Sequence, residues 1–170
     1  MDLVEPITLI IPSHGGFPNS HLPVLLYQAV IKNLEGNPSL VEELFYSNDW
    51  KGPWVNGIYS FDHFHSTTHE VLAVIDGHAK VRLGGPIGKT IEIGVGDVVI
   101  LPAGFSHARM WSNQSFTVVG AYPEGRSWDL RRGDPKELPI VLSNLQQVPL
   151  PKADPIYGLN GPLVKIWSQQ

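Results

Sequence analysis

The sequence contains no cysteine, which excludes disulfide bonds, cysteine-ligated zinc sites, iron–sulfur clusters and thiol catalysis together. Any bound metal must therefore be held by histidine, aspartate or glutamate. No apolar run approaches the roughly 18 residues that a membrane-spanning helix needs, and one of the longest extends only from Leu22 to Ile31. The first residues also lack the positively charged start and apolar stretch of a secretory signal. We expect a cytoplasmic protein with no membrane partner.

Charge is scarce as well, since charged residues make up 16% of the chain and hydrophobic residues 42%. This balance argues against disorder. Twelve basic residues against sixteen acidic ones give a net charge of −4. The one basic cluster, Arg131–Arg132, lies among acidic neighbours, whereas a nucleic-acid surface needs a concentrated basic face. The sequence therefore predicts no nucleic-acid partner.

A chain of 170 residues is expected to form one domain. A domain of this length buries roughly 70% of the surface of its unfolded chain. We predict a single domain over residues 1–170, with a barrel core at about 55–122 and an N-terminal segment, 1–54, packed on it. Seven of the fifteen prolines lie in residues 123–170, which we interpret as an extended C-terminal arm that also packs on the barrel.

Seventeen glycines and fifteen prolines divide the chain into short pieces, which favours an all-β fold because helices tolerate neither residue internally. Short strand-like runs of even spacing are typical of a sandwich or barrel. The predicted strands are Ile7–Ile11, Gly57–Asp62, Glu70–Asp76, His78–Leu83, Lys89–Ile93, Asp97–Leu101, Ser106–Trp111 and Phe116–Tyr122.

Two of these runs, Val71–Ile75 and Val98–Leu101, are apolar on both faces. Such strands must be covered on both sides, here by the opposite sheet and by the terminal arms or a second subunit. Together with the proline-rich arms, this pattern favours a symmetric homodimer of barrels.

One helix is predicted after Asn37, which is a good N-cap and is followed by proline at the first helical position. Leu40, Val41, Leu44 and Phe45 then form one apolar stripe. We expect this helix to end near Ser47–Asn48.

Five of the seven histidines lie between residues 63 and 107. On a strand, His63 and His65 would point to the same face, and Glu70, which opens the next strand, could point back to the same place. A lone His-x-His pair more often marks a solvated strand or turn, and Glu70 alone would most often be a solvated strand end. Together in an apolar interior they would be costly unless a cation compensated them.

The stretch Gly96–His107 adds a further imidazole. A Gly-Asp turn leads into an apolar strand, Pro102-x-Gly104 makes a tight turn, and His107 begins the returning strand. His107 is therefore expected on a neighbouring strand of the same barrel.

These two stretches resemble the paired motifs of the cupin superfamily. Gly57, His63, His65, Glu70 and Gly77 match the first motif at every spacing, and Gly96, Pro102, Gly104 and His107 match the second. The second motif departs at its last position, where Trp111 replaces the usual asparagine. Phrases outside the motifs, such as Gly120–Gly125, resemble the YjlB-like single-domain cupins.

The resemblance implies a double-stranded β-helix, the cupin jelly-roll barrel, with a short N-terminal helix and extended terminal arms. It also implies that His63, His65, Glu70 and His107 surround one metal. Three imidazoles and a carboxylate favour Fe, Mn, Ni, Co or Zn over Mg or Ca. An octahedral ion would keep two positions open for water, oxygen or a chelating substrate.

Strand alternation supplies candidate pocket residues. If His63 and His65 face inward, so do Tyr59 and Phe61, and if His107 faces inward, so do Arg109 and Trp111. Arg109 could bind a substrate carboxylate or form an ion pair at the barrel mouth, and Tyr59 could be an acid/base group or a packed ring. Trp111 could pack in the core or form a wall of the pocket.

The remaining histidines carry less signal. His69 should point opposite to Glu70, as a supporting or loop residue, and His78 should lie with Lys80 and Arg82 on a solvated or interface face. His14 and His21 lie in the turn-rich connector His14–Pro23 and give no indication of a site.

Two functions remain open. The first is a metalloenzyme, dioxygenase-, isomerase- or decarboxylase-like, that acts on a small organic acid, sugar derivative or diketone. The second is a non-catalytic module in which the metal orients a small ligand or stabilises the barrel. Vacant coordination positions favour the enzyme, because a structural metal rarely needs them.

Overall fold

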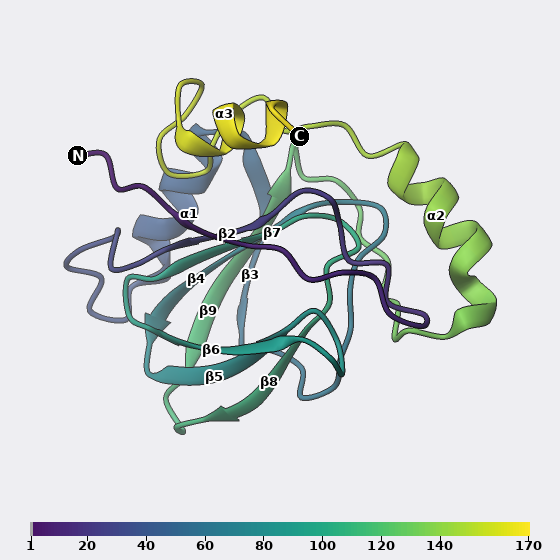
Figure 1. The fold of residues 1–170 in the computed structure, drawn as a ribbon. Helices are drawn as coiled ribbons and strands as arrows, with labels where there is room; N and C mark the ends of the chain where they lie inside the picture. Colours follow the sequence, from purple (N-terminus) through teal and green to yellow (C-terminus); the bar gives the residue numbers. More distant parts are fainter. Residues whose placement is uncertain (1) are drawn as a thin grey trace.

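Two antiparallel sheets face each other in the computed structural model, which describes residues 2–170 (Figure 1). The larger sheet has the order β1-β2-β7-β4-β9-β3 and the smaller one β6-β5-β8. The strands are β1 Ile7–Leu9, β2 Val24–Tyr27, β3 Trp50–Asn56, β4 Glu70–Asp76, β5 His78–Leu83, β6 Lys89–Gly94, β7 Val98–Leu101, β8 His107–Ser112 and β9 Thr117–Pro123. The helices are α1 Pro38–Ser47, the 3-10 helix η1 Pro135–Glu137, α2 Leu138–Gln146 and α3 Pro162–Ser168.

The chain passes repeatedly between the two sheets, and this makes the fold a double-stranded β-helix. From β3 onward it crosses to the smaller sheet at residues 57–65, returns in β4, crosses to β5 and β6, returns in β7, crosses to β8 and returns in β9. Residues 57–65 lie along β8 through hydrogen bonds that pair Tyr59 with Arg109 and His63 with His107. The predicted fold class is confirmed.

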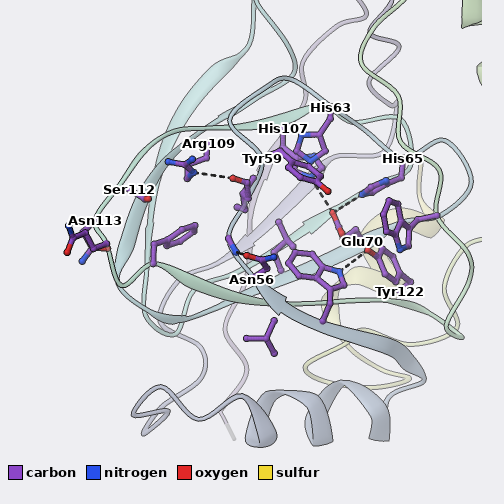
Figure 2. Close-up of a pocket in the computed structure, with 18 residues that line it drawn as sticks. Asn56, Tyr59, His63, His65, Glu70, His107, Arg109, Ser112, Asn113 and Tyr122 are labelled. Carbon is purple, nitrogen blue, oxygen red and sulfur yellow. Dashed lines mark hydrogen bonds and ion pairs between the residues drawn. The ribbon is translucent and has the colours of Figure 1, made fainter.

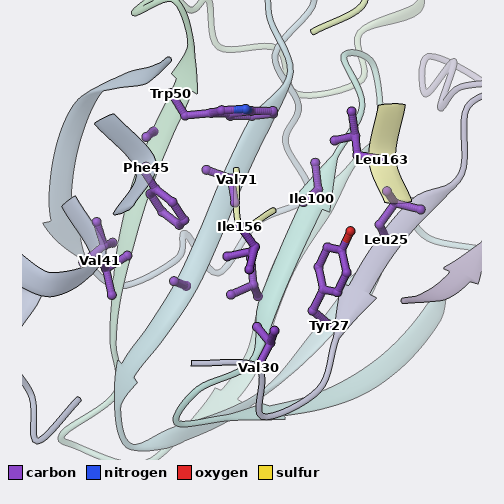
Figure 3. Close-up of a cluster of buried hydrophobic side chains, with 14 of the residues drawn as sticks. Leu25, Tyr27, Val30, Val41, Phe45, Trp50, Val71, Ile100, Ile156 and Leu163 are labelled. Atoms are coloured by element: carbon purple, nitrogen blue, oxygen red, sulfur yellow. The ribbon is translucent and has the colours of Figure 1, made fainter. Parts of the chain in front are cut away.

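Two apolar layers cover the two faces of the larger sheet. Leu72 and Val74 point into the layer between the sheets. Val71, Ala73 and Ile75 point to the opposite face, beneath α1, α3 and the C-terminal segment. Figure 3 shows this outer layer, which holds Val41 and Phe45 of α1, Trp50 of β3, Ile156 and Leu163. The strands predicted to be apolar on both faces are thus covered on both faces within one chain.

The N-terminal helix is confirmed with its cap. The Asn37 side chain accepts a hydrogen bond from the Ser39 amide, Pro38 opens α1, and the helix ends at Ser47. Val41 and Phe45 are buried beneath it. Leu40 is 47% exposed, so its place in the predicted apolar stripe was wrong.

One predicted strand was also wrong, and one strand was not predicted. Gly57–Asp62 is not a regular strand, because it meets β8 only through scattered hydrogen bonds. The strand before it, β3, was missed because Gly52 and Pro53 interrupt its sequence. In the structure, β3 is an edge strand whose register shifts between Lys51 and Trp54, and edges and bulges are where sheets accept proline.

The C-terminal residues pack on the barrel, but they are not uniformly extended, since they form η1, α2 and α3. The buried carboxylate of Asp154 holds the segment that leads into α3. It accepts hydrogen bonds from the Tyr27 hydroxyl and from the amides of Ile156 and Leu163. Trp167 of α3 is buried and donates to the Pro23 carbonyl. Across residues 2–170, no helix has the length and hydrophobicity to span a membrane.

Candidate metal centre

Three predicted metal ligands meet inside the barrel. One donor atom each of His65, Glu70 and His107 lies within 4.8 Å of the others, and all three residues are buried. The same carboxylate oxygen, Glu70 Oε1, lies 3.4 Å from Nε2 of His65 and 3.3 Å from Nε2 of His107. Figure 2 shows the two imidazoles directed at this carboxylate from two different segments of the chain. The residues come from the 57–65 segment, the first position of β4 and the first position of β8.

His63 lies beside this group but is not part of it. Its ring centroid is 4.0 Å from that of His107 and 6.1 Å from that of His65. The main chains of His63 and His107 exchange two hydrogen bonds, of 3.2 and 2.9 Å, so the two residues are held directly opposite each other. The structure therefore brings three of the four predicted ligands into one group and leaves the fourth ring at its edge.

Each imidazole is oriented through its other nitrogen. Nδ1 of His63 lies 2.8 Å from the Phe61 carbonyl, Nδ1 of His107 lies 3.4 Å from the Phe105 carbonyl, and Nδ1 of His65 contacts the Asp129 carbonyl. A carbonyl only accepts, so each Nδ1 carries a proton, and Nε2 of the neutral ring has a lone pair that it can offer to a metal. This is the arrangement in which proteins present histidine to a metal. The donor set thus fits a divalent transition ion.

The pKa values at the centre are set by the pairing of Glu70 with the imidazoles around it. Burial acts to raise the pKa of Glu70, but attraction from His65 and hydrogen bonds from His107 and His65 outweigh it and hold that pKa well below its usual range. Burial acts to lower the pKa of His65, but Glu70 and the Asp129 carbonyl raise it overall. Burial and the neighbouring His107 lower the pKa of His63 to about 3. The carboxylate therefore stays charged with His65 as its positive partner, and a metal ion bound at Nε2 would take the place of the proton on that imidazole.

The 126–131 segment supports the centre from outside the cupin motifs. The Asp129 carboxylate accepts hydrogen bonds from the amides of Ser66 and Thr67, at 2.6 and 3.2 Å, and from the Ser66 hydroxyl. Arg131 Nε donates to the same carboxylate at 2.8 Å. Asp129 thus holds both the His65 ring and the loop that links His65 to Glu70. Sequence reasoning missed it, because no local pattern joins residue 129 to residue 65.

Tyr122 of β9 is a second residue that the motifs do not reveal. Its hydroxyl accepts a 2.8 Å hydrogen bond from Trp54 Nε1. Burial and the adjacent Glu70 carboxylate raise its pKa. Its ring meets His65 edge-on at 6.1 Å and stacks on Trp128 at 6.4 Å. Strand alternation from Val118 or Gly120 could have placed Tyr122 in the interior, but not beside Glu70.

A cavity of about 700 Å³ opens above the centre, within the range of roughly 300–1,000 Å³ that small-molecule sites occupy. His63, His65, Glu70 and His107 all line it. Tyr59 and Arg109, the predicted catalytic residues, line it too. Tyr59 is 51% exposed and stacks on Phe61 at 4.9 Å, which puts it at the rim. Arg109 donates from Nε to the Ile58 carbonyl at 3.1 Å.

Two residues predicted to face inward do not line this cavity. Trp111 is 48% exposed and its ring lies 5.2 Å from that of His78 on the outside of the sheet. The cause is a bulge, because β5 pairs Lys80 with Trp111 but Val81 with Arg109, which leaves Met110 unpaired. The extra residue reverses the alternation, so Ser112 faces the cavity instead. Phe61 lies beneath the Arg132 guanidinium, at 3.9 Å.

The other histidines lie away from the centre. His69 is buried and accepts a 2.9 Å hydrogen bond from the Ala103 amide at Nδ1, and its Nε2 faces the Pro149 carbonyl at 3.1 Å. It supports the turn before His107, as predicted for a loop residue opposite Glu70. His78, His14 and His21 are exposed.

A double-stranded β-helix whose two motifs carry this histidine–glutamate centre defines the chain as a cupin. Its sequence is 35% identical over 164 residues to the uncharacterized protein YjlB of Bacillus subtilis (strain 168), an alignment that covers 96% of this chain and 97% of YjlB. The chain therefore belongs to the YjlB family. No protein-family model matches it.

Solved structures are more distant. A Bacillus anthracis acireductone dioxygenase with cadmium in its active centre is 16% identical, with a TM-score of 0.42 over 62% of this chain and 80% of that one. A DUF861 family protein from Thermotoga maritima is 23% identical, with a TM-score of 0.34 over 51% and 91%. Tomato vicilin is 16% identical, with a TM-score of 0.40 over 66% and 30%.

Proposed function

We propose that this chain is a metal-dependent enzyme that acts on a small oxygen-rich molecule. One observation carries the proposal: Nε2 of His65 and Nε2 of His107 both approach Glu70 Oε1 within 3.4 Å, at the floor of the cavity. His65, Glu70 and His107 would hold one Fe, Mn, Ni, Co or Zn ion, and His63 would complete the set. Such an ion, when bound, supplies a Lewis acid to carbonyl or enediolate oxygens and, if redox-active, access to oxygen chemistry.

The chain's own residues would bind and orient the substrate. Arg109 would bind an anionic group. Tyr59, half-exposed at the rim, would donate a hydrogen bond or transfer a proton through its hydroxyl. Trp128, 48% exposed and stacked on Tyr122, would cover the ligand next to His65 and limit its contact with water.

A non-catalytic binding protein is the second candidate, favoured by the extent of apolar and aromatic wall in the cavity. The two functions differ in turnover. Oxygen uptake and small-acid consumption should be detectable with at least one of the iron, manganese and nickel forms if the chain is an enzyme. Ligand binding without turnover in every form would favour the second candidate.

Metal binding itself is tested by elemental analysis after anaerobic purification. We expect close to one transition ion per chain, and near-complete loss in His107→Ala. His78→Ala is the matched control, because His78 is exposed on the outer face of β5. Near-stoichiometric metal in His107→Ala would contradict the proposed ligand set.

The predicted single domain, homodimer and cytoplasmic location remain proposals. Light scattering on the purified chain tests the dimer: a mass of twice 18.8 kDa is expected, and a monomer would overturn it.

A further inference from the structure

The cavity has a second polar end, beyond the metal centre. Figure 2 shows Arg109, Ser112 and Asn113 at the end opposite Glu70, His65 and Tyr122. Arg109 Nε donates a hydrogen bond to the Ile58 carbonyl, which anchors the side chain. This bond does not use the two terminal NH2 groups of the guanidinium. No ion pair within residues 2–170 includes Arg109. A fixed cation therefore faces the cavity with its charge uncompensated.

Other polar groups that line the cavity can donate hydrogen bonds. Asn56, Ser112 and Gln114 line the cavity with Arg109, and Glu70 is the one acidic residue among the lining residues that the structure describes. The Asn56 side-chain oxygen is already used by the Gly57 amide, which leaves its NH2 group to donate. A cation accompanied by amide and hydroxyl donors suits a carboxylate.

Part of the cavity wall is apolar. Ile58, Leu72 and Phe116 are buried and line the cavity, and their side chains offer no hydrogen bond. A sugar would leave hydroxyl groups unpaired along this stretch, at a cost for each buried group. A hydrocarbon chain or ring would instead gain from covering this wall.

The charges also favour two anionic groups over one. A divalent ion with Glu70 would leave a net charge of +1 at the centre, and Arg109 adds another +1 at the far end. A ligand with a negative charge at each end would balance both, whereas a monoanion would leave one of them without a partner.

We propose, building on the proposed metal function, that the cavity takes a two-ended diacid: an acid head with adjacent oxygens that reaches the His65–Glu70–His107 centre, an apolar spacer, and a distal carboxylate bound by Arg109. Arg109 is then a specificity-determining residue, because it recognises a part of the ligand remote from the metal.

Calorimetry with defined probes tests this inference. The probes are α-keto diacids of increasing chain length and the α-keto monoacids of equal length, each titrated into metal-loaded protein. We expect the diacid to bind about tenfold more tightly than its monoacid at the length that spans the cavity, the magnitude of a hydrogen-bonded charge pair. Arg109→Gln should abolish this preference without changing monoacid affinity, and Arg109→Lys should restore part of it.

Lys80→Gln is the matched control, because it removes the same charge from exposed β5 outside the cavity and should preserve the preference. Equal affinity for diacid and monoacid at every length would overturn the inference, and so would an equal loss of affinity for both probes in Arg109→Gln.

A protein that holds no metal would instead refute the proposed function, and elemental analysis of the purified protein shows this separately. Repeating the titrations after metal removal should weaken both probes of a pair by the same factor, since only the head reaches the centre.

Discussion

The main-chain carbonyl of Asp129 accepts a hydrogen bond from Nδ1 of His65, across 64 residues of sequence. The same residue's carboxylate caps the turn at Ser66 and Thr67, between two of the candidate ligands. Backbone and side chain of one residue thus fix both the ring direction and the loop. The centre depends on the C-terminal half of the chain as well as on the cupin motifs.

Asp129→Asn should therefore weaken metal binding while the chain still folds. The amide keeps the size of the carboxylate but replaces one acceptor oxygen with a donor and loses the Arg131 ion pair. Partners of this kind are typically worth about 10–100-fold in metal affinity, and chelator competition measures the change. Asp134→Asn is the control, since Asp134 only caps the exposed start of η1. Equal affinities in wild type and Asp129→Asn would show that the carboxylate does not position His65.

Tyr122→Phe tests whether the hydroxyl beside Glu70 orients that carboxylate. The variant should still bind one metal ion per chain, but the visible absorption of its cobalt form should change in position or intensity, because Glu70 loses a neighbouring polar group. Tyr157→Phe removes a hydroxyl that contacts Val4 and Asp2 instead, so its cobalt spectrum should match wild type. A Tyr122→Phe spectrum identical to wild type would refute the orienting role.

The stability of the metal-free protein should fall with acid through His69. Burial lowers the pKa of His69 to about 4 in the folded chain, against about 6.5 in an unfolded one. Between these values the unfolded chain binds more protons, so the stability that neutral His69 contributes is present above about pH 6.5 and is lost as the pH falls towards 4. The loss should reach at most about 3 kcal/mol.

Urea unfolding in the presence of chelator, from pH 7.5 down to 4.5, measures this dependence. His69→Gln removes the titration, so its free energy of unfolding should fall less steeply than that of the wild type over the same interval. His63, whose pKa is also lowered, is present in both proteins and cancels in the difference. Parallel pH profiles for the two proteins would rule out His69 as the source.

Asp154→Ala should destabilise the fold by about 3 kcal/mol or more. Asp154 is fully buried, and its removal leaves the Tyr27 hydroxyl and the amides of Ile156, Tyr157 and Leu163 without their acceptor. Chemical unfolding measures the change. A loss below about 1 kcal/mol would mean that water replaces the carboxylate and that α3 is held by apolar packing alone.

Local patterns predicted the strands well where turns and strands alternate regularly. Glu70–Asp76 and His78–Leu83 match β4 and β5 residue for residue. The prediction failed where the chain departs from ideal geometry. The edge strand β3 was not predicted because Pro53 interrupts its sequence. Trp111 was predicted to face inward, but the bulge at Met110 turns it outward, because strict alternation holds only in an unbroken ladder.

The motif spacing placed His65, Glu70 and His107 in one interior, and the structure brings them together. The motif did not reveal that His63 lies at the edge of the group. The position of His63 is fixed by its backbone hydrogen bonds to His107, which the motif spacing does not show. The contacts of Asp129 with His65 and of Tyr122 with Glu70 could not have been predicted, because they join residues that lie far apart in the sequence.

X-ray absorption at the metal edge of the cobalt- or nickel-loaded chain tests the central claim most directly. Two or three imidazoles on one ion should produce the outer-shell scattering typical of histidine ligation, and this signal should weaken in His65→Ala. A first shell of oxygen alone, with no imidazole scattering, would contradict the account.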